Sequence, residues 1–309
     1  MSGHGLRVAL REYLAVRRAL GFKLVRDGLL LEQFVGFCEL ADAERITRDL
    51  AVAWVTSPRN PSPSWLSMRL GVVRGFALWL QAADPATEVP ERGWLPPRRR
   101  SNPYIYSDGD IAALLDAARR VRWPLSAATY HTLFGLLAVT GLRIGEAIRL
   151  DRDDVSLTDR VITITDSKLG KSRQVSLHPT TVTALDSYLD RRRALSPTPN
   201  APALFVHPAG QRIVYLNVCR TFRVLVERAG VVSRSEHCRP TIHGLRHTFA
   251  VNTLIGWYRD GVDVQARLAT LSTWLGHADP KWTYWYLSAT TELLMLANDR
   301  VEAAWRPEP

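Results

Sequence analysis

The chain has 309 residues, of which 46% are hydrophobic and 23% charged, and its 40 lysines and arginines outnumber its 30 aspartates and glutamates. This length allows about two domains, and the composition excludes a disordered or fibrous chain in favour of a globular one. Most of the basic residues are arginines, whose guanidinium suits bidentate contacts with phosphate. A phosphate-rich partner, with nucleic acid first, is therefore expected; a basic enzyme without such a partner is the alternative.

The cysteines Cys38, Cys219 and Cys238 are odd in number and form no CxxC pair, which argues against a disulfide framework and a zinc ribbon. Cys238 follows His237, but further metal ligands at suitable spacing are missing. The N-terminus lacks a signal-peptide core, and no apolar run is long enough to span a bilayer. We therefore expect an intracellular protein with no bound metal and no membrane partner.

Residues 1–84 are predicted to form a small bundle of helices, because apolar residues recur at helical spacing. The predicted helices span residues 6–20, 29–37, 48–55 and 65–79, with a proline-rich turn at 57–64 before the last. Residues 85–106 read as an extended linker, which contains the run Arg98-Arg99-Arg100. The second domain is predicted to span residues 107–309.

Ser107 is the expected cap of the first helix of this second domain. The apolar run 130–139 predicts a buried helix, and residues 161–165 and 174–177 read as strands on either side of a basic hairpin loop. Residues 179–195 predict another helix, 196–202 a surface loop, and the remainder is predicted to be helical except for turns near Gly210 and Gly276. The fold class expected is mainly α with a small β-sheet in the second domain.

The tetrapeptide His-Gly-Leu-Arg occurs twice, at residues 4–7 and at residues 243–246. On a helix, His and Arg three residues apart share a face, where Arg can hold a phosphate oxygen and His can move a proton. In the first copy, His4 lies ahead of any apolar periodicity, in an N-terminus that looks disordered. The second follows the cap Thr241 and leads into an apolar helix, so only this copy is a candidate site.

The second domain supplies further residues of this kind, in an ordered series. An arginine follows the apolar helix in Thr140-Gly-Leu-Arg143-Ile-Gly-Glu146, and a histidine follows a turn in Leu275-Gly-His277. The complete series in chain order is Arg143, Lys168, His243, Arg246, His277 and, nine residues later, Tyr286. In that order these residues resemble the tyrosine recombinase (phage integrase-like) family. The resemblance covers the second domain; residues 1–84 resemble the family's core-binding, DNA-clamping domain by pattern alone.

The resemblance implies a role for each residue. Arg143 and Arg246 would clamp the scissile phosphate and offset charge in the transition state. Lys168 would be the general acid for the departing 5′ oxygen, and His243 would assist proton transfer from the tyrosine. The remaining two would be His277, as hydrogen-bond donor to a phosphate oxygen, and Tyr286, as the nucleophile that forms a 3′-phosphotyrosyl link.

Two of these assignments have competitors nearby. Lys171 lies in the same loop as Lys168, although the family pattern matches Lys168. Tyr284 competes with Tyr286, but positions two apart on a helix face different directions, and the spacing from His277 favours Tyr286. Glu146, one turn after Arg143, is interpreted as structural and as orienting Arg143. Trp282 and Trp285 are interpreted as packing residues.

The function implied is site-specific DNA recombination, which would integrate, excise or transpose a mobile element without ATP or any other cofactor. The ending Tyr286-Leu-Ser-Ala-Thr is similar to that of transposon-associated recombinases. Partners would be double-stranded DNA and a homo-tetramer on synapsed DNA, or an assembly with related recombinases. The apolar tail would dock on a neighbouring protomer. The location would be the cytoplasm, at the nucleoid. The alternatives are a type IB topoisomerase-like strand transferase and a catalytically silent DNA-binding accessory protein.

Overall fold

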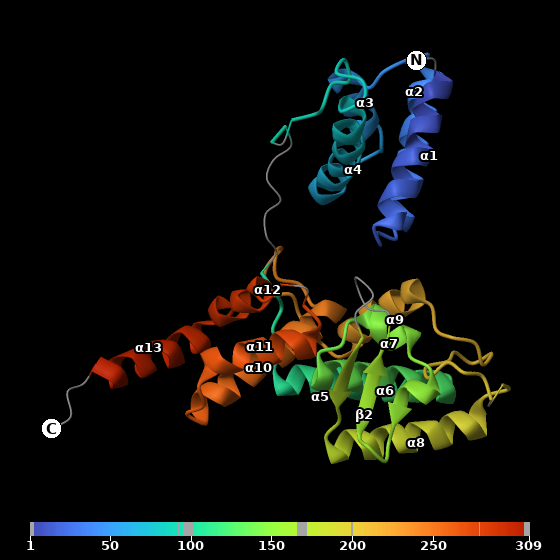
Figure 1. The fold of residues 1–309 in the computed structure, drawn as a ribbon. Coiled ribbons are helices and arrows are strands. Elements are labelled where there is room, and N and C mark those ends of the chain that lie inside the picture. Colours follow the sequence, from blue (N-terminus) through green and yellow to red (C-terminus); the bar gives the residue numbers. More distant parts are fainter. Residues whose placement is uncertain are drawn as a thin grey trace. The chain divides into compact units, whose positions relative to one another are not determined.

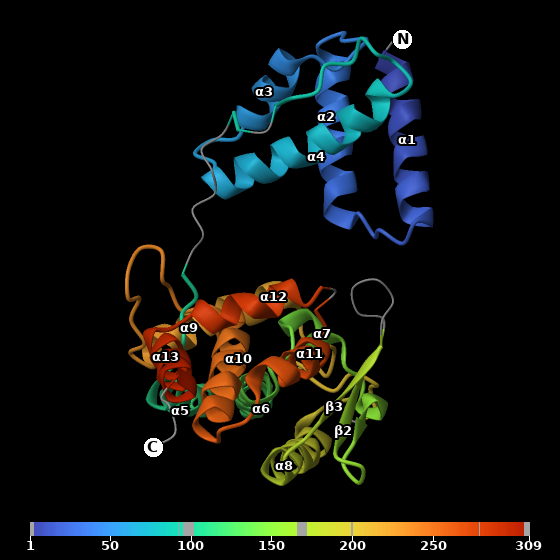
Figure 2. The ribbon, with the colours of Figure 1, turned by 60° about the vertical axis from the view of Figure 1, so that its left-hand side comes forward.

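The structure is a computed structural model that describes residues 3–91, 93–94, 102–165, 172–198, 200–277 and 279–305 (Figures 1 and 2). The chain forms two compact units, Met1–Arg100 and Ser101–Pro309. Both units are mainly helical and the second contains a three-stranded sheet, which confirms the predicted fold class. No helix in the described ranges is both long and apolar enough to cross a membrane.

The first unit is a bundle of four helices. They are α1 (Gly3–Ala19), α2 (Val25–Leu40), α3 (Arg48–Thr56) and α4 (Pro63–Gln81). The side chains of Thr47 and Ser62 accept hydrogen bonds from the first turns of α3 and α4, and so fix where these helices start. The core contains Phe34, Val73 and Phe76, all fully buried.

Helix α1 begins at Gly3, so the prediction that His4 lies ahead of the helical pattern was wrong. The first N–H groups of a helix need no acceptor within it, so polar residues ahead of the first apolar one can join the helix. Leu6 supplies the anchor, because it is buried in the bundle core.

The segment before residue 100 is bonded to the first unit, and the segment after it is bonded to the second unit. In the first unit, Thr87 is buried and the N–H of Glu88 donates to the carbonyl of Ile46 over 2.9 Å. In the second unit, Tyr104 and Tyr106 are buried in the core, and the N–H of Tyr106 donates to Oγ1 of Thr248 over 2.8 Å.

The second unit is organised around the buried helix α6, which packs against α5, α8 and α10 (Figure 2). The helices are α5 (Asp108–Arg119), α6 (Pro124–Thr140), α7 (Ile144–Arg149), α8 (Pro179–Leu195), α9 (Tyr215–Arg228), α10 (Ile242–Arg259), α11 (Val264–Leu275), α12 (Lys281–Tyr284) and α13 (Thr291–Trp305), with the 3-10 turns η1 (Arg152–Asp154) and η2 (Trp285–Ser288). The sheet and α8 lie on one side of α6, and α10, α11 and α13 lie on the other (Figure 1).

The sheet is an antiparallel meander of β1 (Val155–Ser156), β2 (Val161–Ile164) and β3 (Arg173–Ser176). Ile162 pairs with Val175, and both are fully buried, so the alternating β-branched residues place one face of the sheet on the core. At the loop end of the hairpin Ile164 pairs with Arg173. Arg173 therefore lies at the foot of the loop between β2 and β3.

The prediction that the remainder after residue 202 is helical was wrong for two segments. Residues 203–214, where only a turn near Gly210 was predicted, and residues 229–241 are irregular. They contain Pro208, Pro240 and glycines that disfavour a continuous helix. Isolated bridges such as Asp151↔Ala203 satisfy part of their backbone. These pairings join segments far apart in sequence, so no local pattern predicts them.

Candidate active site

Helix α6 ends in a glycine turn that sets the start of α7. Gly141 has a φ of 63°, and its N–H donates to the carbonyl of Leu137 over 3.0 Å. A Cβ at this position would lie 2.5 Å from Cδ1 of Phe249, so conformation and packing both require glycine. Two residues later, Arg143 is the N-cap residue of α7.

Two hydrogen bonds hold the guanidinium of Arg143, and part of the side chain is exposed to solvent. Its Nη1 donates to Oε1 of Glu146 over 2.8 Å, and its Nη2 donates to the carbonyl of Gly276 over 2.8 Å. The side chain is 32% exposed. These contacts confirm the predicted contact between Glu146 and Arg143, and they leave the arginine accessible to a ligand.

Glu146 is a buried carboxylate shared by two arginines. Arg173 donates to both of its oxygens, through Nη1 over 3.1 Å and Nη2 over 2.8 Å. Burial by itself raises the pKa of Glu146, but hydrogen bonds and charge from Arg173 and Arg143 outweigh burial and lower the pKa to about 2. Glu146 is therefore ionised at neutral pH and keeps both guanidinium groups in place.

Arg246, on α10, is almost completely buried and connects the ends of two helices. Its Nη1 donates to the carbonyl of Gly141 over 2.8 Å, and its Nη2 donates to the carbonyl of Leu275 over 2.7 Å. These carbonyls lie at the C-terminal ends of α6 and α11, where unpaired backbone oxygens and the helix dipole favour a cation. Burial, and then the charge of Arg143, lower the pKa of Arg246 to about 10, so it stays protonated at neutral pH.

A second glycine turn follows α11 and presents His277. Gly276 has a φ of 66°, and a Cβ there would lie 2.6 Å from Nη1 of Arg173. Nδ1 of His277 is 2.7 Å from Oγ1 of Thr283, which is itself buried. Burial and the nearby arginines, chiefly Arg246, lower the pKa of His277 to about 4, so its ring is neutral at pH 7.

The two candidate tyrosines face different surroundings. Tyr284 is 54% exposed, whereas Tyr286 is 2% exposed. The ring of Tyr286 lies parallel to that of His277, at an angle of 10° with 6.2 Å between centroids. Burial raises the pKa of Tyr286, and the charge and hydrogen bonding of Arg246 partly offset this. Of the two, only Tyr286 lies among the arginines and histidines.

His243 and His247 stand one turn apart on α10, and the sequence reasoning did not identify the second. The ring of His247 lies 4.6 Å from that of His243 and 5.5 Å from that of Tyr286, between centroids. Burial, with charge from Arg246 and other neighbours, lowers the pKa of His243 to about 4 and that of His247 to about 3. The spacing of four residues along a helix was the available signal for His247.

The comparisons with known proteins agree with this geometry. The model of the phage integrase family matches residues 107–292. The chain belongs to the phage integrase family of tyrosine recombinases.

Individual relatives of this tyrosine recombinase cover nearly the whole chain. A putative integrase/recombinase y4rB of Sinorhizobium fredii (strain NBRC 101917 / NGR234) is 42% identical over 97% of this chain and 98% of its own length. Tyrosine recombinase XerC of Mycobacterium sp. (strain KMS) is 29% identical over 94% of this chain and 96% of its own length. The fold also matches that of the Tn1549 transposon integrase in complex with transposon right end DNA, with 16% identity, a TM-score of 0.68 and coverage of 96% and 98%. The chain is therefore a site-specific DNA recombinase.

Lys168 lies outside the described residues, as does its competitor Lys171. The strand before these lysines, β2, ends at Ile164, and the strand after them, β3, begins at Arg173. Arg173 is hydrogen-bonded to Glu146 beside Arg143. The recombinase thus anchors the base of this loop next to the candidate arginines.

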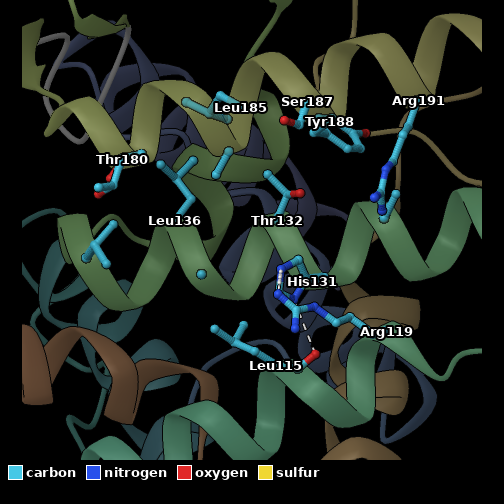
Figure 3. Close-up of a pocket in the computed structure, with 15 residues that line it drawn as sticks. Leu115, Arg119, His131, Thr132, Leu136, Thr180, Leu185, Ser187, Tyr188 and Arg191 are labelled. Atoms are coloured by element: carbon cyan, nitrogen blue, oxygen red, sulfur yellow. Dashed lines mark hydrogen bonds between the residues drawn. The ribbon is translucent and has the colours of Figure 1, made fainter.

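A separate groove lies between α5, α6 and α8, with a volume of about 600 Å³ (Figure 3). Its apolar floor includes Leu136 and Leu185, and Arg119, His131 and Arg191 stand at one end. None of the predicted site residues within the described part of the chain lines this groove. The candidate site is therefore not this groove but the region where α7, α10 and the α11–η2 segment meet.

The assembled site of the recombinase is suited to an oxyanion. Arg143 and Arg246 are held by backbone carbonyls and a buried carboxylate, so their positive charges are fixed before any ligand binds. Fixed donors stabilise developing negative charge better than mobile ones, because they need no reorganisation. The buried tyrosine and the neutral histidines next to them are a candidate nucleophile and candidate proton-exchanging groups.

Proposed function

We propose that the recombinase cleaves DNA with Tyr286 as the nucleophile. The observation that carries the proposal is the placement of the Tyr286 ring beside His247 and His277, with Arg246 close enough to its hydroxyl to affect its pKa. Tyr284, two residues earlier, is exposed. A phenol becomes a nucleophile at neutral pH when a cation and proton-accepting groups lie beside it, as Arg246 and two histidines do beside Tyr286.

Arg143 and Arg246 hold the scissile phosphate in this proposal. Arg246 is fixed at the ends of α6 and α11, and Arg143 is half-exposed beside it, so a phosphate bound at the surface meets one buried and one accessible guanidinium. Their charge offsets the charge that develops on the non-bridging oxygens as phosphorus becomes five-coordinate. His277 adds a hydrogen bond to one of these oxygens.

Proton transfers complete the step. The Oη of Tyr286 attacks phosphorus and loses its proton to His243, whose lowered pKa of about 4 leaves it neutral and able to accept at pH 7. The bond from phosphorus to the 5′ oxygen breaks, and this oxygen takes a proton from Lys168. The product is a 3′-phosphotyrosyl link and a free 5′-hydroxyl, and attack by a 5′-hydroxyl of a partner strand reverses the step.

Strand exchange between two duplexes requires several protomers, and we propose a homo-tetramer acting on DNA in the cytoplasm. Residues 1–84 clamp the duplex in this proposal, with residues 85–106 as the linker. Helix α13 packs on its own unit through Leu293, which is fully buried, while Leu294, Met295, Val301 and Trp305 are exposed. The exposed side chains are the surface that docks on a neighbouring protomer. Substitution of Val301 and Trp305 by alanine should leave monomer stability unchanged and weaken synapsis of two DNA sites, measured by mobility shift across protein concentrations.

Covalent trapping tests the proposed nucleophile. The purified full chain is mixed with fragments of its source genome, denatured, and the DNA that remains attached is sequenced. The enriched segment is then made as a duplex with a nick close to the cleaved phosphate, so that the released fragment diffuses away and the adduct accumulates.

Tyr286→Phe and the matched Tyr284→Phe are compared with the unchanged chain on this duplex. The account predicts an adduct that Tyr286→Phe abolishes and Tyr284→Phe retains. Loss of the adduct with Tyr284→Phe alone would overturn the assignment of the nucleophile. Relaxation of a supercoiled plasmid with no second site would favour a topoisomerase-like activity instead of recombination.

A further inference from the structure

Two arginines of different exposure share the carboxylate of Glu146. The Arg173 side chain is 8% exposed, whereas that of Arg143 is 32% exposed. Both donate to the same buried group, but only Arg143 can reach a ligand at the surface. Arg173 therefore has a different task from Arg143.

Both oxygens of Glu146 are fully used. Oε1 accepts from Nη1 of Arg143 over 2.8 Å and from Nη1 of Arg173 over 3.1 Å. Oε2 accepts from Nη2 of Arg173 over 2.8 Å and from the backbone N–H of Arg143 over 3.0 Å. Arg173 thus forms the two-pronged pair, and the Arg143 guanidinium forms only one bond to the carboxylate.

We infer that Arg173 is a positioning residue: it occupies Glu146 so that Arg143 keeps part of its guanidinium available for the phosphate. This inference rests on the proposed function. If Arg173 were absent, Oε2 of Glu146 would be open to a second bond from the Arg143 guanidinium. The preferred geometry of an arginine–carboxylate pair is two parallel bonds, so Arg143 would turn toward Glu146 and away from the substrate.

Arg173 also fixes the second acceptor of Arg143. Its Nε donates to the carbonyl of Trp274 over 2.8 Å, near the end of α11. The next turn brings Gly276 against the Arg173 guanidinium, at a distance that leaves no room for a Cβ. The carbonyl of Gly276 accepts from Nη2 of Arg143. Both acceptors that hold Arg143, Glu146 and Gly276, are therefore in contact with Arg173.

Lysine cannot take this place. The bonds of Arg173 use Nε, Nη1 and Nη2 of one planar group toward two separate acceptors. A lysine ammonium is a single point of charge and cannot reproduce this fork, although it keeps the positive charge beside Glu146. Arg173→Lys therefore removes the geometry of the guanidinium and keeps its positive charge.

The test is single-turnover cleavage of the trapped duplex, made with either a normal phosphate or a methylphosphonate at the cleaved position. The methylphosphonate lacks the charged oxygen that Arg143 would contact. Arg173→Lys is the main variant, because it keeps a cation beside a buried carboxylate and so favours folding; Arg173→Gln is the second. Arg193→Lys is the matched control, since Arg193 is exposed on α8 and pairs with Asp190. Melting temperature and DNA affinity are measured for each chain.

On the phosphate duplex, Arg173→Lys should cleave about 100-fold more slowly than the unchanged chain, the loss typical of one misplaced oxyanion donor. On the methylphosphonate duplex the two should differ by less than about fivefold, and Arg193→Lys should match the unchanged chain on both. Equal losses on both duplexes, or no loss on either, would overturn the inference and leave the proposed function intact. If the unchanged chain forms no adduct, the proposed function fails, and this inference falls with it.

Discussion

The two copies of His-Gly-Leu-Arg show what a short sequence does and does not determine. Residues 4–7 lie in α1 and residues 243–246 lie in α10, so both copies are helical. Leu6 and Leu245 are both buried and anchor their helices to a core. Local structure and the role of the leucine are therefore the same in both places.

The arginines at the ends of the two copies have different surroundings. Arg7 is partly exposed and pairs with the carboxylate of Glu39 on the neighbouring helix. Arg246 is 2% exposed and is bonded to two helix-end carbonyls, with Tyr286 nearby. The helix ends that bind Arg246 come from segments distant in sequence. Tertiary packing therefore makes Arg246 a candidate anion-binding group, whereas Arg7 forms a surface ion pair.

Replacement of the two arginines by lysine should give the largest contrast. Arg246→Lys loses the planar fork that spans Gly141 and Leu275, so single-turnover cleavage should fall by about a thousandfold. Arg7→Lys keeps a cation beside Glu39, and the cleavage rate of bound DNA should stay within about threefold. Similar losses in both variants, with folding intact, would contradict the distinction between the two copies.

The carboxylate of Glu146, which holds Arg143 close to Arg246 of the second copy, should give the next largest effect. Glu146 has a folded pKa of about 2, below its ordinary value of 4.5, so its ionised form contributes stability above about pH 4.5 that is lost as pH falls toward 2. The shift corresponds to about 3 kcal/mol. Denaturant unfolding at pH 6 and pH 3 should show a steeper acid loss in the unchanged chain than in Glu146→Gln. Identical pH dependence in the two chains would count against the ionised, doubly paired carboxylate.

The glycine of the second copy should give a smaller effect. A Cβ at Gly244 would lie 2.9 Å from the carbonyl oxygen of Tyr104, which is backbone and cannot easily move. Gly244→Ala should therefore lower the free energy of unfolding by about 1–2 kcal/mol. Gly36 on α2 has open space around the position of a Cβ, so Gly36→Ala should raise stability by up to about 1 kcal/mol. Thermal unfolding measures both, and a gain from Gly244→Ala would show that α10 packs less closely than described.

Periodicity in the sequence predicted the helical units and the β-hairpin. The ordered series of motif residues predicted which side chains lie close together in the fold. Four of these residues lie on or next to four different elements, yet the structure places them around one point: Arg143, Arg246, His277 and Tyr286. Their order along the chain was informative because the family pattern is carried by the whole series. Lys168 stays a prediction, since it falls outside the described residues.

Arg173 and His247 were not identified, for different physical reasons. Arg173 ends a basic loop, where arginines are usually solvated, and only its pairing with Glu146 across the fold accounts for its burial. His247 follows Arg246 directly, so it reads as part of the motif until the structure brings it against Tyr286. Both placements depend on partners far away in sequence, and spacing alone does not reveal them.

The most direct test of the account is the site of covalent attachment. DNA trapped on the unchanged chain is digested with nuclease, and the peptide that spans Tyr284 and Tyr286 is fragmented in a mass spectrometer. The account predicts a nucleotide joined through its 3′ phosphate to the phenolic oxygen of Tyr286, with Tyr284 unmodified. A nucleotide on Tyr284, or on any other side chain, would contradict the central claim that packing among Arg246, His247 and His277 selects the nucleophile.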